Sequence, residues 1–136
     1  MDSKGIKNTI KRQDLLYPEL SSKIVGSAFD VYNELGSGHS EKYYEKGLAE
    51  ALSKNNLKFK EQISFPIKYN NKIIGRKILD FLVEDKIVVE IKKGNRFSKS
   101  NIDQVLEYLK MNNFKLAILI NFGNEDVVFK RIINFS

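Results

Sequence analysis

The stretch that decides the fold of this chain is Ile78-Leu-Asp-Phe-Leu-Val-Glu-Asp-Lys-Ile-Val-Val-Glu-Ile-Lys92. It reads as two apolar strands joined by a short polar turn. Three charged residues interrupt the apolar runs: Asp80, Glu90 and Lys92. Side chains alternate along a strand, so Glu90 and Lys92 share one face. Because a buried charge without a partner is costly, this segment contains either a salt bridge or a functional site.

The length of the loop between the two strands decides whether Asp80 joins the other two charges. A two-residue loop would place Asp80 and Glu90 on opposite faces of the sheet. A three-residue loop, residues 84–86, sets Asp80 directly across from Glu90, with Cβ atoms about 5 Å apart. Two carboxylates this close repel each other unless a cation or a proton lies between them. A metal site therefore requires the longer loop or a compensating bulge, and a buried ion pair with Lys92 is the alternative.

The periodicity of apolar residues predicts the elements around this hairpin. They are helices over residues 18–35 and 40–55, strands over 58–68, 72–83 and 86–92, a helix over 101–112, and strands over 116–120 and 127–133. The third strand is apolar on both faces, which predicts a central position. The helix that follows it favours a βαβ crossover with parallel strands. The predicted fold class is α/β, a mixed sheet flanked by helices in the order ααβββαββ.

Length and composition restrict the possible chemistry. The 136 residues suit a single domain over residues 18–136, preceded by a basic arm over residues 1–17. The absence of cysteine excludes disulfides, thiolate catalysis and cysteine zinc sites. The single histidine, His39, disfavours a multi-histidine metal site, so any metal would have oxygen ligands, which favours Mg²⁺ or Mn²⁺. We find neither a membrane-spanning apolar run nor a signal peptide, and expect a cytoplasmic protein without a membrane partner.

The charge distribution favours an anionic partner. The formal net charge is +6 and the pI is about 9.4. Basic residues cluster in the N-terminal arm and directly after the charged strand, and those that we expect to contact nucleic acid are Lys11, Arg12, Lys93, Arg96 and Lys99. A solvated basic surface is the plainer interpretation of the same pattern.

Several motifs in this chain resemble one family. The spacing of Asp80, Glu90 and Lys92 resembles the PD-(D/E)XK nuclease motif. Upstream, Gly38-His-Ser-Glu41-Lys-Tyr-Tyr44 matches the G-x-x-E-x-x-Y signature of the GxxExxY protein family, a branch of that superfamily. Further similar pieces lie, in the same order, at residues 24–38, 104–109 and 119–123. The resemblance spans about residues 20 to 133 and implies a restriction-endonuclease-like core around the mixed sheet.

The resemblance implies roles for the motif residues. Asp80 and Glu90 would bind Mg²⁺ or Mn²⁺, helped by the backbone carbonyl of Ile91. Glu41 would complete the site from the second helix, touching the metal directly or through water. Lys92 would be the catalytic lysine, orienting the attacking water and stabilising negative charge.

Other residues around these motifs have plainer interpretations. The resemblance makes Gln104 an additional catalytic site residue, although it lies off the apolar stripe of its helix and could simply be solvated. Glu41 lies in a first helical turn, where the helix dipole favours an acid in any case. Tyr44 lies on an apolar stripe and favours core packing, His39 reads as a surface residue, and Gln62 as a structural hydrogen-bonding group.

Together these observations predict a metal-dependent endonuclease or exonuclease that hydrolyses phosphodiester bonds in DNA. The resemblance adds a resolvase-like action on branched or damaged DNA and a homodimeric assembly. One alternative is a non-catalytic nucleic-acid-binding module on the same fold. Another is a protein-interaction or regulatory domain whose basic patches are incidental.

Overall fold

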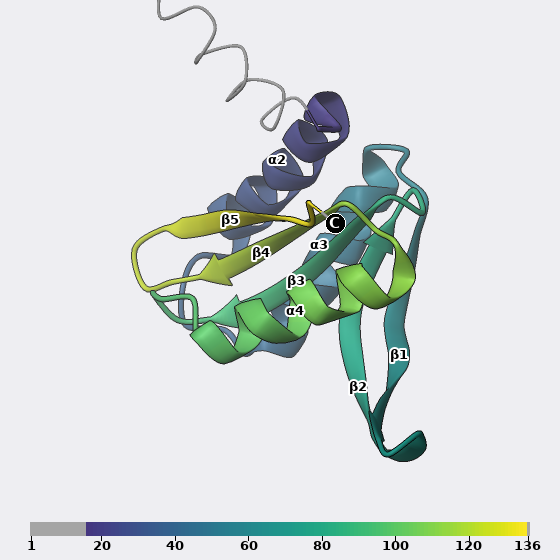
Figure 1. Cartoon of the computed structure of the whole chain (residues 1–136). Coiled ribbons are helices and arrows are strands. Elements are labelled where there is room, and N and C mark those ends of the chain that lie inside the picture. The colour runs from purple at the N-terminus through teal and green to yellow at the C-terminus, as the bar shows by residue number, and fades with distance from the viewer. Residues whose placement is uncertain (1–15, 136) are drawn as a thin grey trace, which may run out of the picture.

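A computed structural model describes residues 16–135 as an α/β domain with a five-stranded sheet (Figure 1). The elements are α2 (Pro18–Leu35), α3 (Glu41–Lys54), β1 (Phe59–Tyr69), β2 (Lys72–Val83), β3 (Ile87–Lys93), α4 (Lys99–Asn112), β4 (Leu116–Phe122) and β5 (Val127–Ile133). The predicted order ααβββαββ and the predicted class are confirmed. Most of the predicted basic arm, including Lys11 and Arg12, lies outside the described residues.

The sheet has the order β1-β2-β3-β4-β5 and is mixed. Only β3 and β4 pair in parallel, and α4 connects them, which confirms the predicted βαβ crossover. Strand β3 is central, and its residues from Ile87 to Ile91 are buried, as its apolar lettering predicts. Strand β1 lies at the edge, where Pro66 removes no hydrogen bond from an interior ladder.

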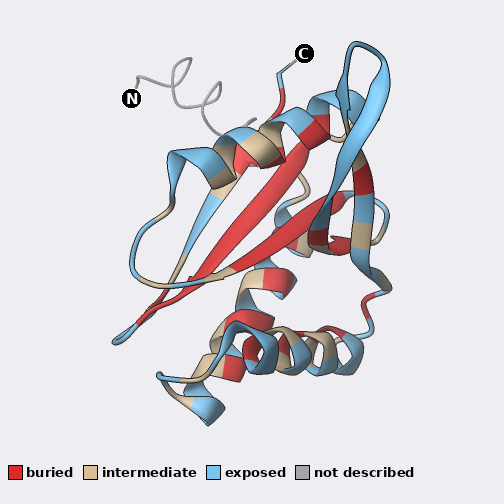
Figure 2. Ribbon diagram, turned by 90° about the horizontal axis from the view of Figure 1, so that it is seen from below, coloured by how far each residue is buried: buried red, intermediate tan, exposed pale blue. Residues whose placement is uncertain are grey.

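Helices cover both faces of the sheet, with α2 and α3 on one face and α4 on the other (Figure 2). In β3, Ile87, Val89 and Ile91 belong to the core beneath α2 and α3. Val88 belongs to the core beneath α4. By the same alternation, Glu90 and Lys92 lie on the face of Val88. No helix in residues 16–135 combines the length and apolar composition that crossing a bilayer requires.

The turn between β2 and β3 has the three-residue form. Val83 pairs with Ile87, and the turn consists of residues 84–86. Glu84 and Asp85 adopt left-handed backbone, with φ of 53° and 54°. The register that a site requires is therefore present, and the two-residue alternative is excluded.

Strand β2 is longer than its contact with β3. It pairs with β3 only from Phe81 to Val83, whereas it pairs with β1 along almost its whole length. Figure 1 shows the outer part of the β1–β2 hairpin projecting away from the rest of the sheet. A register shift between Ile67 and Lys68 leaves Ile74 as an extra residue beside Gly75, which forms a β-bulge. Strands β2 and β3 thus separate at Asp80, and this separation creates the candidate site.

Candidate active site

Asp80 and Glu90 occupy the point where β2 and β3 separate. The backbone N–H of Asp80 donates to Oε1 of Glu90 at 3.0 Å. In return, the backbone N–H of Ile91 donates to Oδ2 of Asp80 at 2.7 Å. Each acid therefore occupies a backbone donor of the neighbouring strand, in place of the next ladder bond. These two bonds fix both carboxyl groups side by side, as the longer loop predicts.

The electrostatics of this pair reflect burial and mutual repulsion. Glu90 is only 8% exposed. Burial, followed by the negative charge of Asp80 and a hydrogen bond between the two carboxyl groups, raises the pKa of Glu90 to about 8. The positive charge of Lys92 acts in the opposite direction but is a smaller influence. Without a cation, the pair therefore retains a proton at neutral pH.

Lys92 lies on the same face of β3 as Glu90 and is half-buried. Its charge acts on the Glu90 carboxyl, so the two groups are near each other. Among residues 16–135, however, no salt bridge joins Lys92 to Asp80 or to Glu90. The structure thus favours a site over the closed ion pair that was the alternative interpretation of the sequence.

Glu45 is an additional acid beside the pair that the sequence interpretation missed. It lies on α3, and burial followed by the charge of Asp80 raises its pKa. The amide of Gln62 donates a hydrogen bond to Oε2 of Glu45. Gln62 has a φ of 53°, and the β1–β2 register pairs its two neighbours but not Gln62 itself. A signal for Glu45 was available, because residues i and i+4 of a helix share a face and Glu41 was already a candidate.

Neither Glu41 nor Gln104 forms a hydrogen bond or ion pair with Asp80 or Glu90 in the described part of the chain. Glu41 is exposed in the first turn of α3, and its charge acts on Glu45 as the last of several causes. Gln104 is half-buried on α4, and no hydrogen bond links it to another side chain in the described part of the chain. The structure brings Asp80 and Glu90 into direct contact, with Lys92 and Glu45 within range of their charges, and it forms no hydrogen bond between Gln104 and any of these side chains.

Tyr44 of the G-x-x-E-x-x-Y segment is structural. It is 1% exposed and stacks on Phe122, with ring centroids 4.3 Å apart and an interplanar angle of 3°. Its hydroxyl donates to the carbonyl of Gly36 at 2.6 Å and accepts the N–H of His39 at 3.4 Å. The ring Nε2 of His39 donates to the carbonyl of Leu35 at 2.9 Å. These bonds fix the connection before α3 and therefore the position of the acids on its first two turns.

The basic loop after β3 is anchored to the sheet at its backbone. The N–H of Gly94 donates to the carbonyl of Phe122 at 3.1 Å, and the side-chain amide of Asn121 donates to the carbonyl of Arg96. The side chains of Lys93, Arg96 and Lys99 are exposed. Lys99 forms an exposed ion pair with Asp103, one turn along α4, at 3.0 Å. Lys93 and Arg96 are thus the cations of this loop that are available to a ligand.

The donor set of the pair fits a hard divalent cation. Each carboxyl accepts a backbone N–H through one oxygen, and a cation would take the place of the proton in the hydrogen bond between the two carboxyl groups. In residues 16–135, no group of three or more His, Cys, Asp or Glu side chains could hold a metal ion. The available protein ligands are therefore the Asp80 and Glu90 carboxylates and the Ile91 carbonyl, with water in the other positions. Mg²⁺ usually keeps several waters and takes one or two carboxylates, so the set suits it.

A mixed α/β sheet whose central strands separate at an Asp, a Glu and a Lys defines a nuclease-like domain. The model of the family described as "PD-(D/E)XK nuclease superfamily" matches residues 18–132, and the chain belongs to this superfamily. Proteins of this superfamily are typically nucleases.

A solved structure supports the fold. The one titled "Crystal structure of SSO0001" aligns with a TM-score of 0.52 and 21% identity, covering 69% of this chain and 50% of that one. This chain therefore spans about half the length of that protein, and at this identity the likeness concerns the fold alone. No curated protein matches the chain.

Proposed function

We propose that this protein is a metal-dependent nuclease of the GxxExxY branch that hydrolyses phosphodiester bonds in DNA. The observation that carries the proposal is the pair Asp80 and Glu90, held side by side next to Lys92, which forms no salt bridge with either acid. Carboxylates kept this close without a counter-charge favour the binding of a cation. Mg²⁺ is the proposed ion, with Mn²⁺ as a substitute.

The residues of the chain have separate tasks in this reaction. The reciprocal bonds to the N–H groups of Asp80 and Ile91 orient both carboxylates before substrate binds. When bound, a divalent ion supplies Lewis acidity and lowers the pKa of a coordinated water. Lys92 stabilises the negative charge that develops on the phosphate oxygens. Glu45, oriented by Gln62, adds a further negative charge on the side of α3.

The remaining proposed roles depend on the family resemblance and on exposure. Glu41 would reach the ion directly or through water, and Gln104 would contribute from α4. Lys93 and Arg96 would hold phosphates beside the cleaved bond, since both are exposed directly after β3. Lys99, Lys11 and Arg12 would add to this charge. A branched or damaged DNA substrate, a homodimer and a cytoplasmic location complete the proposal.

The test is cleavage of supercoiled, single-stranded and four-way-junction DNA in the presence of Mg²⁺ or Mn²⁺. We expect Asp80→Asn and Lys92→Met to reduce cleavage by more than about a hundredfold, because each removes a group that acts on the reacting phosphate. Lys110→Met, an exposed residue on the last turn of α4, is the matched control and should retain activity. Cleavage that survives in Asp80→Asn and Lys92→Met would rule out this site.

One observation favours the non-catalytic alternative: the absence of a third clustered metal-binding side chain in residues 16–135. A binding module on this fold would retain salt-sensitive affinity for DNA without any dependence on divalent ions. Calorimetric titration of Mg²⁺ into the protein separates the two functions. Heat of Mg²⁺ binding that is present in the wild type and abolished by Asp80→Asn supports the nuclease. Absence of Mg²⁺ binding heat in a wild type that still binds DNA supports the module.

A further inference from the structure

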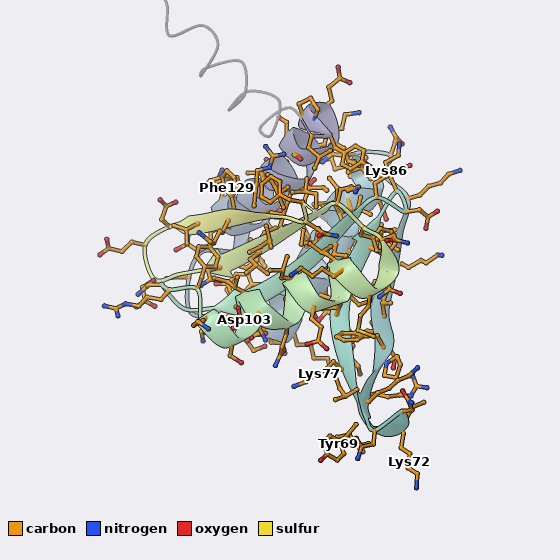
Figure 3. The ribbon with its side chains drawn as sticks, viewed as in Figure 1. Tyr69, Lys72, Lys77, Lys86, Asp103 and Phe129 are labelled. Carbon is orange, nitrogen blue, oxygen red and sulfur yellow. The ribbon has the colours of Figure 1, made fainter. Side chains whose placement is uncertain are left out.

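The outer part of the β1–β2 hairpin, residues 63–79, projects from the domain and is here named the projecting hairpin (Figure 1). Several of its large apolar side chains are exposed, although Phe65 and Leu79 are buried: Tyr69 and Ile74 are each 67% exposed and Ile78 is 56% exposed. Figure 3 shows Tyr69 and Lys72 at the tip, pointing away from the body. Exposed apolar side chains on a two-stranded ribbon indicate a surface that another molecule covers.

The charge of the projecting hairpin has one sign. Four basic residues and no acid occur in this segment, and they are Lys68, Lys72, Arg76 and Lys77. All four side chains are exposed, and none of them forms a salt bridge within the described residues. Arg76 instead donates to the hydroxyl of Ser64 on the neighbouring strand at 3.3 Å. A ribbon with four uncompensated cations fits a polyanion.

The projecting hairpin is continuous with the candidate active site. Its second strand is β2, which passes directly into Asp80. The nine residues from Lys72 to Asp80 are separated by eight steps along the strand, which extend about 27 Å at the usual rise of a strand. This equals the length of about eight base pairs of duplex DNA. A duplex with its cleaved phosphate at Asp80 can therefore follow the hairpin to its tip.

We propose that the projecting hairpin binds the duplex DNA arm that flanks the cleaved phosphate, lying as a two-stranded ribbon along a groove. The inference rests on the proposed nuclease function for the position of that phosphate. The major groove of B-form DNA is wide enough for a two-stranded ribbon, whereas that of A-form RNA is too narrow for side chains to read. Arg76 and Lys77, on opposite faces of the ribbon, neutralise phosphates, and Ile78 and Tyr69 contact sugars and base edges.

The same charge argues against a second copy of this chain as the occupant. Two hairpins that paired across a dimer would bring four cations from each copy together, in a chain whose net charge is already +6. Like charges at close range oppose such an interface unless anions separate them. Charge complementarity therefore selects DNA over self-association.

The test measures binding without cleavage, by fluorescence anisotropy of a labelled duplex in the presence of EDTA. We expect Arg76→Ala/Lys77→Ala to weaken binding about tenfold near physiological salt and to lower the slope of log affinity against log salt by about 2, the counterions of two phosphates. Lys23→Ala/Lys110→Ala removes two exposed lysines from α2 and α4 and is the matched control. Equal affinity of the hairpin variant and this control would overturn the inference.

A second variant, Ile74→Ser/Ile78→Ser, tests the apolar contacts. We expect weaker duplex binding with an unchanged salt slope, because no phosphate contact is lost. Light scattering is measured in parallel on wild type and variant. A wild-type dimer that this variant converts to a monomer, with duplex affinity per chain unchanged, would assign the hairpin to a second copy and overturn the inference.

Failure of this inference and failure of the nuclease proposal give different results. If the wild type cleaves DNA and Arg76→Ala/Lys77→Ala binds and cleaves like the control, the hairpin inference is wrong and the nuclease proposal stands. If the wild type never cleaves and the hairpin variant loses duplex affinity, the hairpin is a duplex-binding element and the nuclease proposal is wrong.

Discussion

Glu90 links the stability of the metal-free protein to pH. Burial and the charge of Asp80 raise its pKa from an ordinary 4.5 to about 8. The folded chain therefore keeps a proton that the unfolded chain releases, so the stabilisation is complete below 4.5 and is lost as the pH rises towards about 8. We expect Glu90→Gln to match wild type in acid and to be more stable above this window. Calorimetric melting of both proteins in EDTA, between pH 4.5 and about 8, checks this. Stability that changes with pH equally in the two proteins would contradict it.

A divalent cation should reverse this behaviour. It replaces the shared proton, so it binds the folded pair and stabilises it by mass action. We expect the Tm of the wild type to rise with Mg²⁺ concentration at alkaline pH and that of Asp80→Asn/Glu90→Gln to stay constant. A comparable rise in the double variant, measured by thermal shift, would place the ion elsewhere.

The two acids of α3 should differ in importance. The charge of Asp80 acts on Glu45, and Gln62 holds Glu45 in place, whereas Glu41 is exposed one turn earlier. We expect Glu45→Gln to weaken Mg²⁺ activation of cleavage by about tenfold, the usual effect of a group supporting a metal site. Glu41→Gln should have a smaller effect. The reverse order in the Mg²⁺ dependence of kcat would support the family assignment of Glu41 as the helix acid.

Single residues show where sequence interpretation succeeds and where it ends. Asp80, Glu90 and Lys92 were recognisable because charges in an apolar strand are conspicuous, and the structure brings them together. The helical spacing from Glu41 pointed to Glu45, but its contact with Gln62 was not recognisable, because that contact depends on the left-handed backbone of Gln62, which interrupts the pairing opposite Asp80. Such a local irregularity has no signature in a glutamine flanked by alternating residues.

At the scale of elements, the turn of residues 84–86 sets the register of the site. Asp85 has a φ of 54°, a conformation that glycine adopts more easily. We expect Asp85→Gly to stabilise the protein by about 1 kcal/mol, since left-handed backbone is costly for a residue with a Cβ atom. Its exposed ion pair with Lys60, at 3.4 Å, contributes little.

Asp103→Gly is the control for this turn. It lies in the interior of α4, where glycine should instead cost roughly 0.5–1 kcal/mol, from its lower helix propensity and from loss of the ion pair with Lys99. Urea denaturation of the two variants checks the opposite signs. Loss of stability in Asp85→Gly would show that this aspartate makes a contact worth more than its backbone strain.

The elements themselves followed from periodicity. The central place of β3 and the crossover through α4 followed from apolar patterns, which act over short ranges. The length of the turn before β3 did not follow, because Glu84, Asp85 and Lys86 suit either register. Contacts between distant elements decide between them, and a local pattern does not contain those contacts.

At the scale of the whole molecule, the domain should have a rigid centre and a more labile projection. The strands β3 and β4 are buried between two helical layers, whereas residues 72–78 of the projecting hairpin are all exposed. We expect amide hydrogens of β4 to exchange last and those of residues 72–78 to exchange early. Hydrogen-exchange mass spectrometry checks this order, and equal protection in both segments would contradict it.

The reciprocal bonds of Asp80 and Glu90 also determine the direction of the hairpin. Each carboxyl accepts a backbone N–H of the opposite strand. Because these two N–H groups are occupied, the backbone pairing of β2 with β3 does not extend beyond Asp80 and Glu90. An alanine at either position would free that donor and allow the strands to join, turning the hairpin toward the sheet. Replacement of either acid by its amide keeps the acceptor oxygen and therefore keeps the direction of the hairpin relative to the sheet. The two residues proposed to act on the phosphate thus also orient the projecting hairpin, which is proposed to bind the rest of the duplex.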